Sequence, residues 1–196
     1  MAGHSRRVAD LARRLSKHVG VEPKDQQDIF FAALLHDIGK IGFPDALLSR
    51  PVSRMSGEDL AHYRKHPATG AAALMPLEEL KHAAQIVRAH HERFDGQGYP
   101  DGAAGEDIAI GARILAIAND YDGLQSGTLS ERRMSPEEAQ ARAKGLVEAY
   151  SKGLDFSLID TEKIKDNVRQ AIKAQELYDS IVDEIYQEMN KERDGS

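Results

Sequence analysis

The chain has 196 residues, of which 41% are hydrophobic and 30% charged, and this composition is typical of a soluble globular protein with one domain and a sizeable core. Its net charge of -6 argues against a surface for a nucleic-acid polymer, because such surfaces are usually basic, although it still permits a small anionic ligand. The absence of cysteine excludes disulfides and thiolate metal sites, and the lack of a long apolar run or signal peptide predicts a cytoplasmic protein with no membrane partner.

The first segment, residues 4–19, is predicted to form an amphipathic helix. Its inner stripe includes Val8, and His4 lies four residues earlier, so we expect the imidazole to point inward. The outer face is predicted to carry the basic residues Arg6, Arg7, Arg13, Arg14 and Lys17. After a linker that contains Pro23, we expect Asp25 to cap a second helix, which ends in an adjacent His-Asp pair.

That pair, His36-Asp37, follows an apolar stretch and precedes Gly39 and Lys40. On a helix, one face would carry Ile29, Ala33, His36, Asp37 and Lys40. Polar groups removed from water must be paired or bound to an ion, so a metal ion explains this face. The alternative is a histidine that is hydrogen-bonded to its neighbouring aspartate in an ordinary core. The breakers Gly39, Gly42 and Pro44 predict a loop that leaves Lys40 beside the pair.

Two later histidine motifs also lie at predicted helix ends. Residues 45–50 are predicted to form a short helix, and Ser56 is predicted to begin another, which breaks at His66 because Pro67 follows it. A strong helix is predicted over residues 77–93, and the pair His90-His91 lies near its C-terminal end. The loop over residues 95–102 has three glycines and a proline, and we expect it to form the rim of a site.

Residues 108–124 are predicted to form a buried helix that carries Asn119, Asp120 and Asp122 near its end. The candidate ligands therefore come from several different helices, and they can converge only in an all-α core. Neutral imidazole with carboxylate is the ligand chemistry of Mn, Fe, Zn, Ni or Co rather than Ca. The remaining histidines, His18, His62 and His82, are expected on the surface.

The last segment has apolar residues at heptad spacing, with one polar position: Ile164, Val168, Ala171, Gln175, Tyr178, Val182, Ile185 and Met189. We therefore expect a main domain over residues 1–150 and a C-terminal helical extension over residues 151–196. The extension would dock on its own domain, form a homodimer contact or act as a signalling helix that leads to a partner. Fewer than four heptads do not distinguish these roles.

The motifs occur in an order that resembles the HD-GYP family of HD-superfamily metal phosphohydrolases, over roughly residues 3–150: His4, His36-Asp37-Ile38-Gly39-Lys40, His66-Pro67, His90-His91-Glu92 and Gly98-Tyr99-Pro100. The resemblance implies an all-α HD-superfamily helical bundle with a metal site in its core. It also implies a phosphodiesterase that hydrolyses a 3′-5′ phosphodiester of cyclic di-GMP to linear pGpG or onward to GMP, by a metal-bridging hydroxide. A sensory or receiver domain before residue 1 would be typical of the family.

Residue by residue, the resemblance implies two divalent transition metal ions, of Fe, Mn, Ni, Co or Zn. One ion would be bound by His4, His36 and Asp37 with a further ligand near Asn119, and the other by His66, His90 and His91, with Asp37 bridging the two. Lys40 would face a substrate phosphate, and the pocket mouth would be shaped by Gly98, Tyr99 and Pro100. Trinuclear members have an acidic residue one turn before the first histidine, a position that would precede Met1, so we expect a dinuclear site.

The chain departs from the family pattern at Asn119, where aspartate is usual. Asparagine can ligate through its carbonyl oxygen but brings no charge. Asp122, one turn further on, is our second choice, with a capping or salt-bridge role as its alternative, and a one-residue shift would make Asp120 the ligand. The family's arginine motif is also changed. Three arginines would either contact the ligand or form ion pairs at the surface: Arg93, Arg132 and Arg133. The ring of Tyr99 would either stack on the substrate or stabilise its own loop.

Three functions fit these residues. The first is the metal-dependent cyclic di-GMP phosphodiesterase, which is favoured by the complete set of histidines together with Asp37 and Lys40. The second is a catalytically weak module that binds a cyclic dinucleotide and signals through protein contacts, and Asn119 with the altered arginine segment favours it. The third is a hydrolase for a different phosphoester or cyclic dinucleotide, against which the Gly98-Tyr99-Pro100 motif argues. The sequence does not decide the metal or the product.

Overall fold

The computed structural model describes residues 2–129, 132–135, 138–139 and 141–142, which belong to one compact unit of the chain. The regular structure of these residues is helical, and none of them lies in a strand, which confirms the all-α prediction. None of their helices is both long and apolar enough to cross a membrane. The predicted boundary at residue 150 and the predicted extension over residues 151–196, with its heptad pattern, lie outside the described residues.

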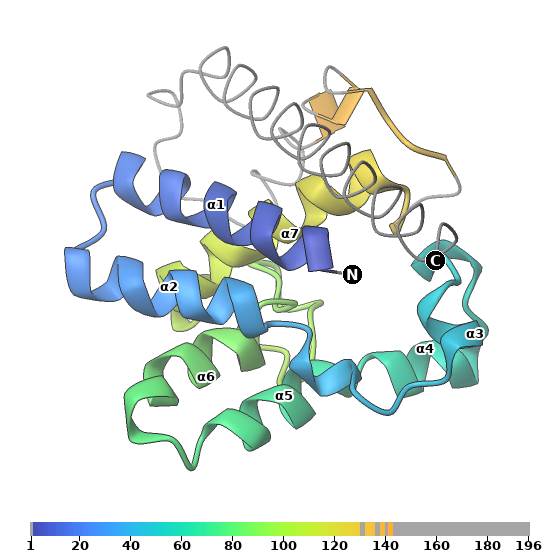
Figure 1. The fold of residues 1–196 in the computed structure, drawn as a ribbon, viewed down its shortest axis with the longest axis horizontal. Coiled ribbons are helices and arrows are strands. Elements are labelled where there is room, and N and C mark those ends of the chain that lie inside the picture. Colours follow the sequence, from blue (N-terminus) through green and yellow to red (C-terminus); the bar gives the residue numbers. More distant parts are fainter. Residues whose placement is uncertain (1, 130–131, 136–137, 140, 143–196) are drawn as a thin grey trace, which may run out of the picture. The chain divides into compact units, whose positions relative to one another are not determined.

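The core is built around α7 (Ile110–Ser126), as the apolar stretch over residues 108–124 predicted. From Gly111 to Leu124 every residue except Arg113 is buried, because α1 (Ala2–His18), α2 (Pro23–Leu35) and α6 (Lys81–Ala89) all pack against it. Figure 1 shows α1 and α2 side by side, with α7 beside α1. A methyl group on Gly111 would lie 2.8 Å from Ile86 and 2.9 Å from Ile29, so glycine permits the close packing.

A second helix pair, α5 (His66–Leu74) and α6, packs on α2 and on the short 3₁₀ helix η1 (Ile38–Lys40). At Gly39 of η1 this contact is made by backbone atoms. A Cβ atom on Gly39 would overlap the carbonyl oxygen of His66 and would lie 2.6 Å from the amide nitrogen of Gly70. The absence of a side chain at Gly39 therefore lets the segment after the His36-Asp37 pair rest directly on the start of α5.

The remaining described elements are short. They are α3 (Asp45–Leu48), η2 (Val52–Arg54), α4 (Gly57–Tyr63), η3 (Glu78–Leu80) and η4 (Gly105–Asp107). The predicted short helix at residues 45–50 corresponds to α3. The hydroxyl oxygen of Ser56 accepts a hydrogen bond of 3.2 Å from the amide of Asp59, so the predicted cap of α4 is confirmed.

Two helix boundaries differ from the predictions. The second helix begins at Pro23, with Glu22 in the cap position, so the prediction of Asp25 as cap is wrong; proline suits the first helical turn because its missing N–H needs no partner there. The helix predicted over residues 77–93 starts with the 3₁₀ turn η3, is α-helical only from Lys81, and ends at Ala89. The amide of Glu92 donates to the carbonyl of Ala89 at 2.9 Å, a tight turn that ends the helix before the His90-His91 pair.

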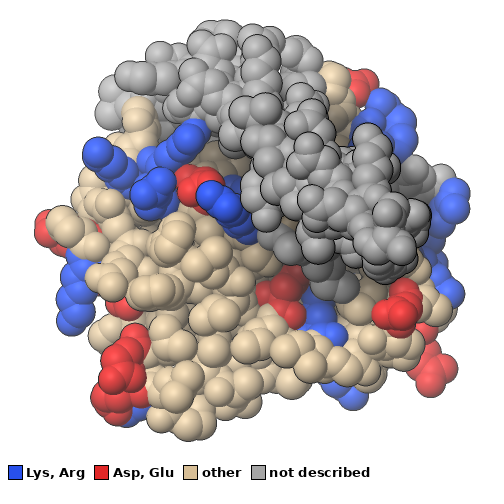
Figure 2. Space-filling model, in the orientation of Figure 1, with Lys and Arg blue, Asp and Glu red and all other residues tan. Residues whose placement is uncertain are grey.

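The charged surface agrees with most of the predictions for α1. Figure 2 shows basic side chains gathered over this helix, and the exposed ones are Arg6, Arg13, Arg14 and Lys17. The prediction is wrong for Arg7, which is only partly exposed and lines a cavity. Arg7 lies three residues after His4 and so shares the inward face of the helix. The three histidines predicted on the surface, His18, His62 and His82, are all exposed.

Candidate metal centre

Three buried imidazoles at helix ends are oriented in the same way. In each, Nδ1 lies against the main-chain carbonyl three residues earlier, and because a carbonyl can only accept, Nδ1 must carry the proton. The Nδ1 atoms of His36, His66 and His90 lie 2.7, 2.7 and 2.6 Å from the oxygens of Ala33, Tyr63 and Val87. This arrangement leaves the lone pair of each Nε2 free to bind a cation.

Two of these Nε2 atoms have no hydrogen-bond partner among the described residues. They belong to His66 and His90, whose side chains are completely buried. A buried polar atom without a partner costs free energy, and both atoms lie in a cluster of other nitrogen and oxygen donors. The donor set therefore fits a metal ion.

The donors form two groups, and within each group the ligand atoms lie within 4.8 Å of one another. One group is His4, His36 and Asp37, and the other is His66, His90 and His91. The carboxylate of Asp37 lies close to both, because its Oδ1 is 3.4 Å from Nε2 of His36 and 3.9 Å from Nε2 of His66. A single carboxylate is thus placed to contact ions in both groups.

His4 is oriented by a carboxylate on α7 rather than by a backbone carbonyl. Its Nδ1 lies 2.6 Å from Oδ2 of Asp122, and Arg7 donates to both oxygens of the same carboxylate at 2.6 and 3.0 Å. Burial alone would raise the pKa of Asp122, but the hydrogen bonds from His4 and Arg7 outweigh it and hold this pKa below its usual value. Asp122 is therefore ionised and fixes the ring of His4.

Lys40 lies beside the His36-Asp37 pair, as predicted. Its Nζ is 2.8 Å from Oδ1 of Asp37 and donates to the hydroxyl oxygen of Tyr63, also at 2.8 Å. Burial would lower the pKa of Lys40, but the negative charge of Asp37 outweighs this effect and raises it. Burial would likewise raise the pKa of Asp37, but electrostatic interactions with His36 and Lys40 outweigh this effect and hold it well below its usual value. The pair is ionised at neutral pH.

Four of the histidines, His36, His66, His90 and His91, are neutral at the same pH. Burial, followed by the charge of Lys40, lowers the pKa of His66 to about 4. Burial and the neighbouring imidazoles lower the pKa of His90 and of His91 well below 6.5, and burial also lowers that of His36. Neutral imidazole is the form that ligates metals, so these rings need not lose a proton to bind an ion at neutral pH.

The loop that follows His90-His91 folds back over the pair. The carboxylate of Glu92 is buried, and its Oε1 accepts hydrogen bonds from the amides of Asp101 and Gly102 at 2.6 and 3.1 Å. The ring of Tyr99 stacks on His91, with centroids 4.8 Å apart and an angle of 20° between the planes. A Cβ on Gly98 would collide with the backbone of Glu92, so glycine is needed where the loop crosses this segment.

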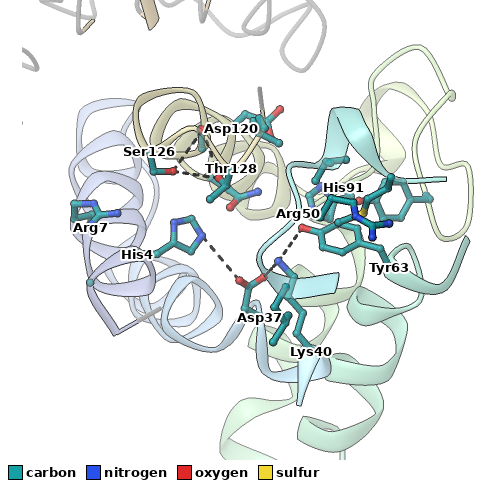
Figure 3. Close-up of a pocket in the computed structure, with 18 residues that line it drawn as sticks. His4, Arg7, Asp37, Lys40, Arg50, Tyr63, His91, Asp120, Ser126 and Thr128 are labelled. Carbon is teal, nitrogen blue, oxygen red and sulfur yellow. Dashed lines mark hydrogen bonds and ion pairs between the residues drawn. The ribbon is translucent and has the colours of Figure 1, made fainter. Parts of the chain in front are cut away.

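A cavity of 550 Å³ opens beside the histidines, and Figure 3 shows the side chains that line it. Its wall includes most of the charged groups described above, together with apolar residues of the 45–55 and 123–129 segments. The charged and polar lining residues are His4, Arg7, Asp37, Lys40, Arg50, Tyr63, His91, Tyr99, Asn119, Asp120, Ser126 and Thr128. The cavity can hold a small molecule in direct contact with Asp37 and Lys40.

The structure brings most of the predicted site residues together. Besides the residues of the two donor groups, Lys40, Tyr99 and Asn119 line the cavity, and Asp120 lies on the same wall. Asp122 is paired with His4 and Arg7. Gly98 and Pro100 shape the loop without lining the cavity. Arg93 pairs with Asp95 at 2.6 Å and Arg132 with Glu138 at 2.8 Å, and Arg133 lies outside the cavity wall.

Sequence reasoning missed several cavity residues, among them Arg7, Arg50 and Tyr63. Spacing could have identified two of them, because Arg7 follows His4 by three residues and Tyr63 precedes His66 by three. No sequence pattern distinguishes Arg50 from the other arginines. Its guanidinium pairs with the carboxylate of Asp59, and it reaches the cavity from the segment after α3.

Comparison with known proteins gives consistent matches. A model of the HD domain matches residues 1–144. A probable cyclic di-GMP phosphodiesterase of Vibrio cholerae serotype O1 is 38% identical over 146 residues, which are 68% of this chain and 33% of the relative. The 3′3′-cGAMP-specific phosphodiesterase 3 of the same organism is 35% identical over 125 residues, which are 64% of this chain and 27% of the relative.

A solved structure of an HDG"Y"P protein from Bdellovibrio bacteriovorus matches with a TM-score of 0.63 and 30% sequence identity, over 74% of this chain and 47% of that one. These matches confirm the family resemblance and the helical-bundle fold that the motifs predicted. The chain spans a third or less of the length of the two curated relatives.

Proposed function

Because this chain belongs to the HD domain family, we propose that it is a metal-dependent phosphodiesterase that hydrolyses cyclic di-GMP. The observation that carries the proposal is the pair of buried Nε2 atoms of His66 and His90, which have no partner among the described residues. The Nε2 atom of His66 lies 3.9 Å from the carboxylate of Asp37. An ordinary core would pair such atoms, whereas a metal centre requires them to be free.

We assign one divalent ion to His4, His36 and Asp37 and a second to His66, His90 and His91. Asp37 would be a ligand of both ions, since its carboxylate lies within 4.0 Å of imidazole nitrogens of both groups. Imidazole with carboxylate suits Fe, Mn, Co, Ni or Zn. When bound, such ions supply Lewis acidity and lower the pKa of water.

Asn119 is our choice for a further ligand of the first ion, through its carbonyl oxygen. Its side chain lies in the cavity wall with His4 and Asp37 and is 8% exposed. Asp122 is less suitable, because both of its oxygens already accept hydrogen bonds from Arg7. We therefore give Asp122 the role of orienting His4, which is the type of support that metal-ligating histidines usually have.

The cavity supports a phosphate-containing substrate. Its volume of 550 Å³ is within the usual range for small-molecule sites, about 300–1,000 Å³. Lys40, Arg7 and Arg50 bring positive charge to its wall, which attracts phosphate groups. Lys40 is placed to contact a phosphate oxygen where negative charge increases during hydrolysis, and Tyr99 offers a flat ring at the same wall. The relatives are named for cyclic di-GMP and 3′3′-cGAMP, both cyclic dinucleotides.

A second function, a module that binds a cyclic dinucleotide without rapid hydrolysis, is favoured by one observation. Asn119 offers the cavity a neutral oxygen where the family usually has a carboxylate, so the first ion would be bound less tightly. The two groups of donors, His4, His36 and Asp37 and His66, His90 and His91, are all present. For that reason we prefer the enzyme to the binding module.

The deciding experiment combines elemental analysis of protein purified without chelator with turnover of cyclic di-GMP and 3′3′-cGAMP, followed by chromatography of the products. His66→Ala is the test variant, and His82→Ala, at an exposed position, is its control. We expect about two ions per chain, as in dinuclear hydrolases, and hydrolysis of cyclic di-GMP to pGpG or GMP that is lost only in the test variant. Binding without turnover favours the second function, and a protein that takes up no metal after reconstitution contradicts both assignments of ions.

A further inference from the structure

Tyr63 lies at the C-terminal end of α4, with its side chain in the wall of the cavity. Its hydroxyl oxygen is 2.8 Å from Nζ of Lys40, and the same Nζ is 2.8 Å from Oδ1 of Asp37. Figure 3 shows Tyr63 and Lys40 pointing toward each other beside Asp37. The tyrosine hydroxyl thus borders the space that the proposed substrate phosphate would occupy.

The direction of the hydrogen bond from Lys40 determines what the hydroxyl group of Tyr63 can still do. A protonated lysine has three N–H donors and no acceptor, so Lys40 must donate and Tyr63 must accept. The hydroxyl group keeps its own proton, and no acceptor for that proton is found among the described residues. A molecule in the cavity can therefore accept a hydrogen bond from Tyr63.

The position of this donor is fixed by the proposed metal ligands. The ring of Tyr63 meets that of His66 edge to face, with centroids 4.9 Å apart, and its main-chain carbonyl accepts the Nδ1 proton of His66 at 2.7 Å. The ring also lies near that of Phe43, with centroids 6.5 Å apart. A donor held in this way needs little reorganisation to meet a ligand.

We propose that Tyr63 is a substrate-binding residue whose hydroxyl group donates a hydrogen bond to a phosphate oxygen of the bound cyclic dinucleotide. The proposal rests on the proposed function, because it places the phosphate beside Asp37 and Lys40. Lys40 and Tyr63 then act as two neighbouring donors, one charged and one neutral. The neutral donor adds a directed contact without increasing the repulsion between Lys40 and the proposed metal ions.

The test variant is Tyr63→Phe, which removes the hydroxyl group and keeps the ring, the carbonyl bonded to His66 and the ion pair of Lys40 with Asp37. The probe for binding is a hydrolysis-resistant phosphorothioate analogue of cyclic di-GMP. We expect the Kd of this probe to rise and kcat/KM for cyclic di-GMP to fall, each by about ten- to a hundredfold, with unchanged metal content. A Kd and a kcat/KM within about twofold of wild type overturn the proposal.

A double-mutant cycle distinguishes direct contact from a purely positioning role for Tyr63. If Tyr63 only held Lys40 in place, its substitution would have no effect once Lys40 is replaced by methionine. We expect instead that the double variant binds the probe about tenfold more weakly than Lys40→Met alone, and equal Kd values overturn the proposal. The control is Ser56→Ala, which removes the cap of α4 and so loosens the same helix without changing the cavity wall.

The role of Tyr63 can also be tested if the proposed phosphodiesterase activity is not found. If wild-type protein with bound metal hydrolyses no cyclic dinucleotide, the probe becomes inorganic phosphate, titrated into wild type and Tyr63→Phe. Weaker binding of phosphate by the variant, by about tenfold, supports a hydroxyl contact with phosphate even without turnover. Equal binding overturns the proposal.

Discussion

His4 and Asp122 are 118 residues apart in the chain, and Nδ1 of the histidine lies 2.6 Å from Oδ2 of the aspartate. The contact joins the N-terminal helix to the central helix α7 at the edge of the cavity. Arg7 also holds the carboxylate, with hydrogen bonds to both of its oxygens. The orientation of one proposed metal ligand therefore depends on the ion pair between Arg7 and Asp122.

Asp122→Asn should weaken metal binding at the first site. The amide keeps the shape of the side chain but loses the charge that stabilises Arg7 and orients His4, and loss of such a partner typically lowers metal affinity about 10- to 100-fold. Competition with a chelator measures the effect. Asp28→Asn is the control, because it removes a contact with the exposed histidine His82 outside the cavity. Equal metal retention in the two variants would contradict this role of Asp122.

Gly39→Ala should destabilise the protein and release metal. The new methyl group would overlap the carbonyl oxygen of His66, so either η1 or the start of α5 must shift. Overpacking of this kind typically lowers the free energy of unfolding by about 1–3 kcal/mol, which urea denaturation measures. At Gly57 a methyl group would have no atom within 4 Å, so Gly57→Ala should leave stability and metal content unchanged. Similar curves for the two variants would refute the prediction.

Asn119→Asp should change stability in opposite directions without and with metal. In the metal-free protein, a new carboxylate in a position that is 8% exposed is poorly solvated and should lower the melting temperature. With metal present, the added charge should increase retention of the ion by about tenfold or more, because a carboxylate replaces a neutral ligand. Calorimetry with and without chelator checks both signs. An effect of the same sign in the two states would exclude Asn119 as a ligand.

The stability of the metal-free protein should fall as the pH falls from about 6.5 to about 4. Burial lowers the pKa of His66 to about 4 from its ordinary value of 6.5, so in this range the unfolded chain binds more protons than the folded one. Stability therefore rises with pH across this window. The shift corresponds to about 3 kcal/mol for this residue.

Urea denaturation of the metal-free protein at about pH 7 and about pH 5 tests the sign. In His66→Gln one titrating group is removed, so the loss of stability between the two pH values should be smaller than in wild type. A wild-type protein that is equally stable at both values would show that the buried imidazoles do not titrate in this way.

Several residues of the two donor groups could be identified from the sequence, because three of the histidines lie at positions marked by local signals. His36 precedes a run of helix breakers, His66 precedes a proline, and His90 follows an apolar helical stripe. The order of these motifs provided the family resemblance. Local signals also placed Lys40 correctly, since it lies three residues after Asp37.

The contacts between distant helices could not be predicted in the same way. The pairing of Arg7 with Asp122 depends on how α1 packs on α7, and helical periodicity identifies an inward face without naming its partner. The early end of α6 has a similar cause. Helix propensity alone would continue the helix beyond Ala89. In the structure a turn follows Ala89, and the carboxylate of Glu92 accepts hydrogen bonds from the amides of Asp101 and Gly102, a contact between distant parts of the chain.

The acceptors that orient His36, His66 and His90 are main-chain carbonyls, and this has a consequence for how the site can vary during evolution. A side-chain partner such as Asp122, which orients His4, can be lost by a single substitution. A main-chain carbonyl is present whatever the amino acid. A substitution three positions before one of these histidines, even at Tyr63, therefore keeps the carbonyl that fixes the tautomer of the ring. At His4 the opposite holds, and its orientation can be lost by a single substitution on another helix.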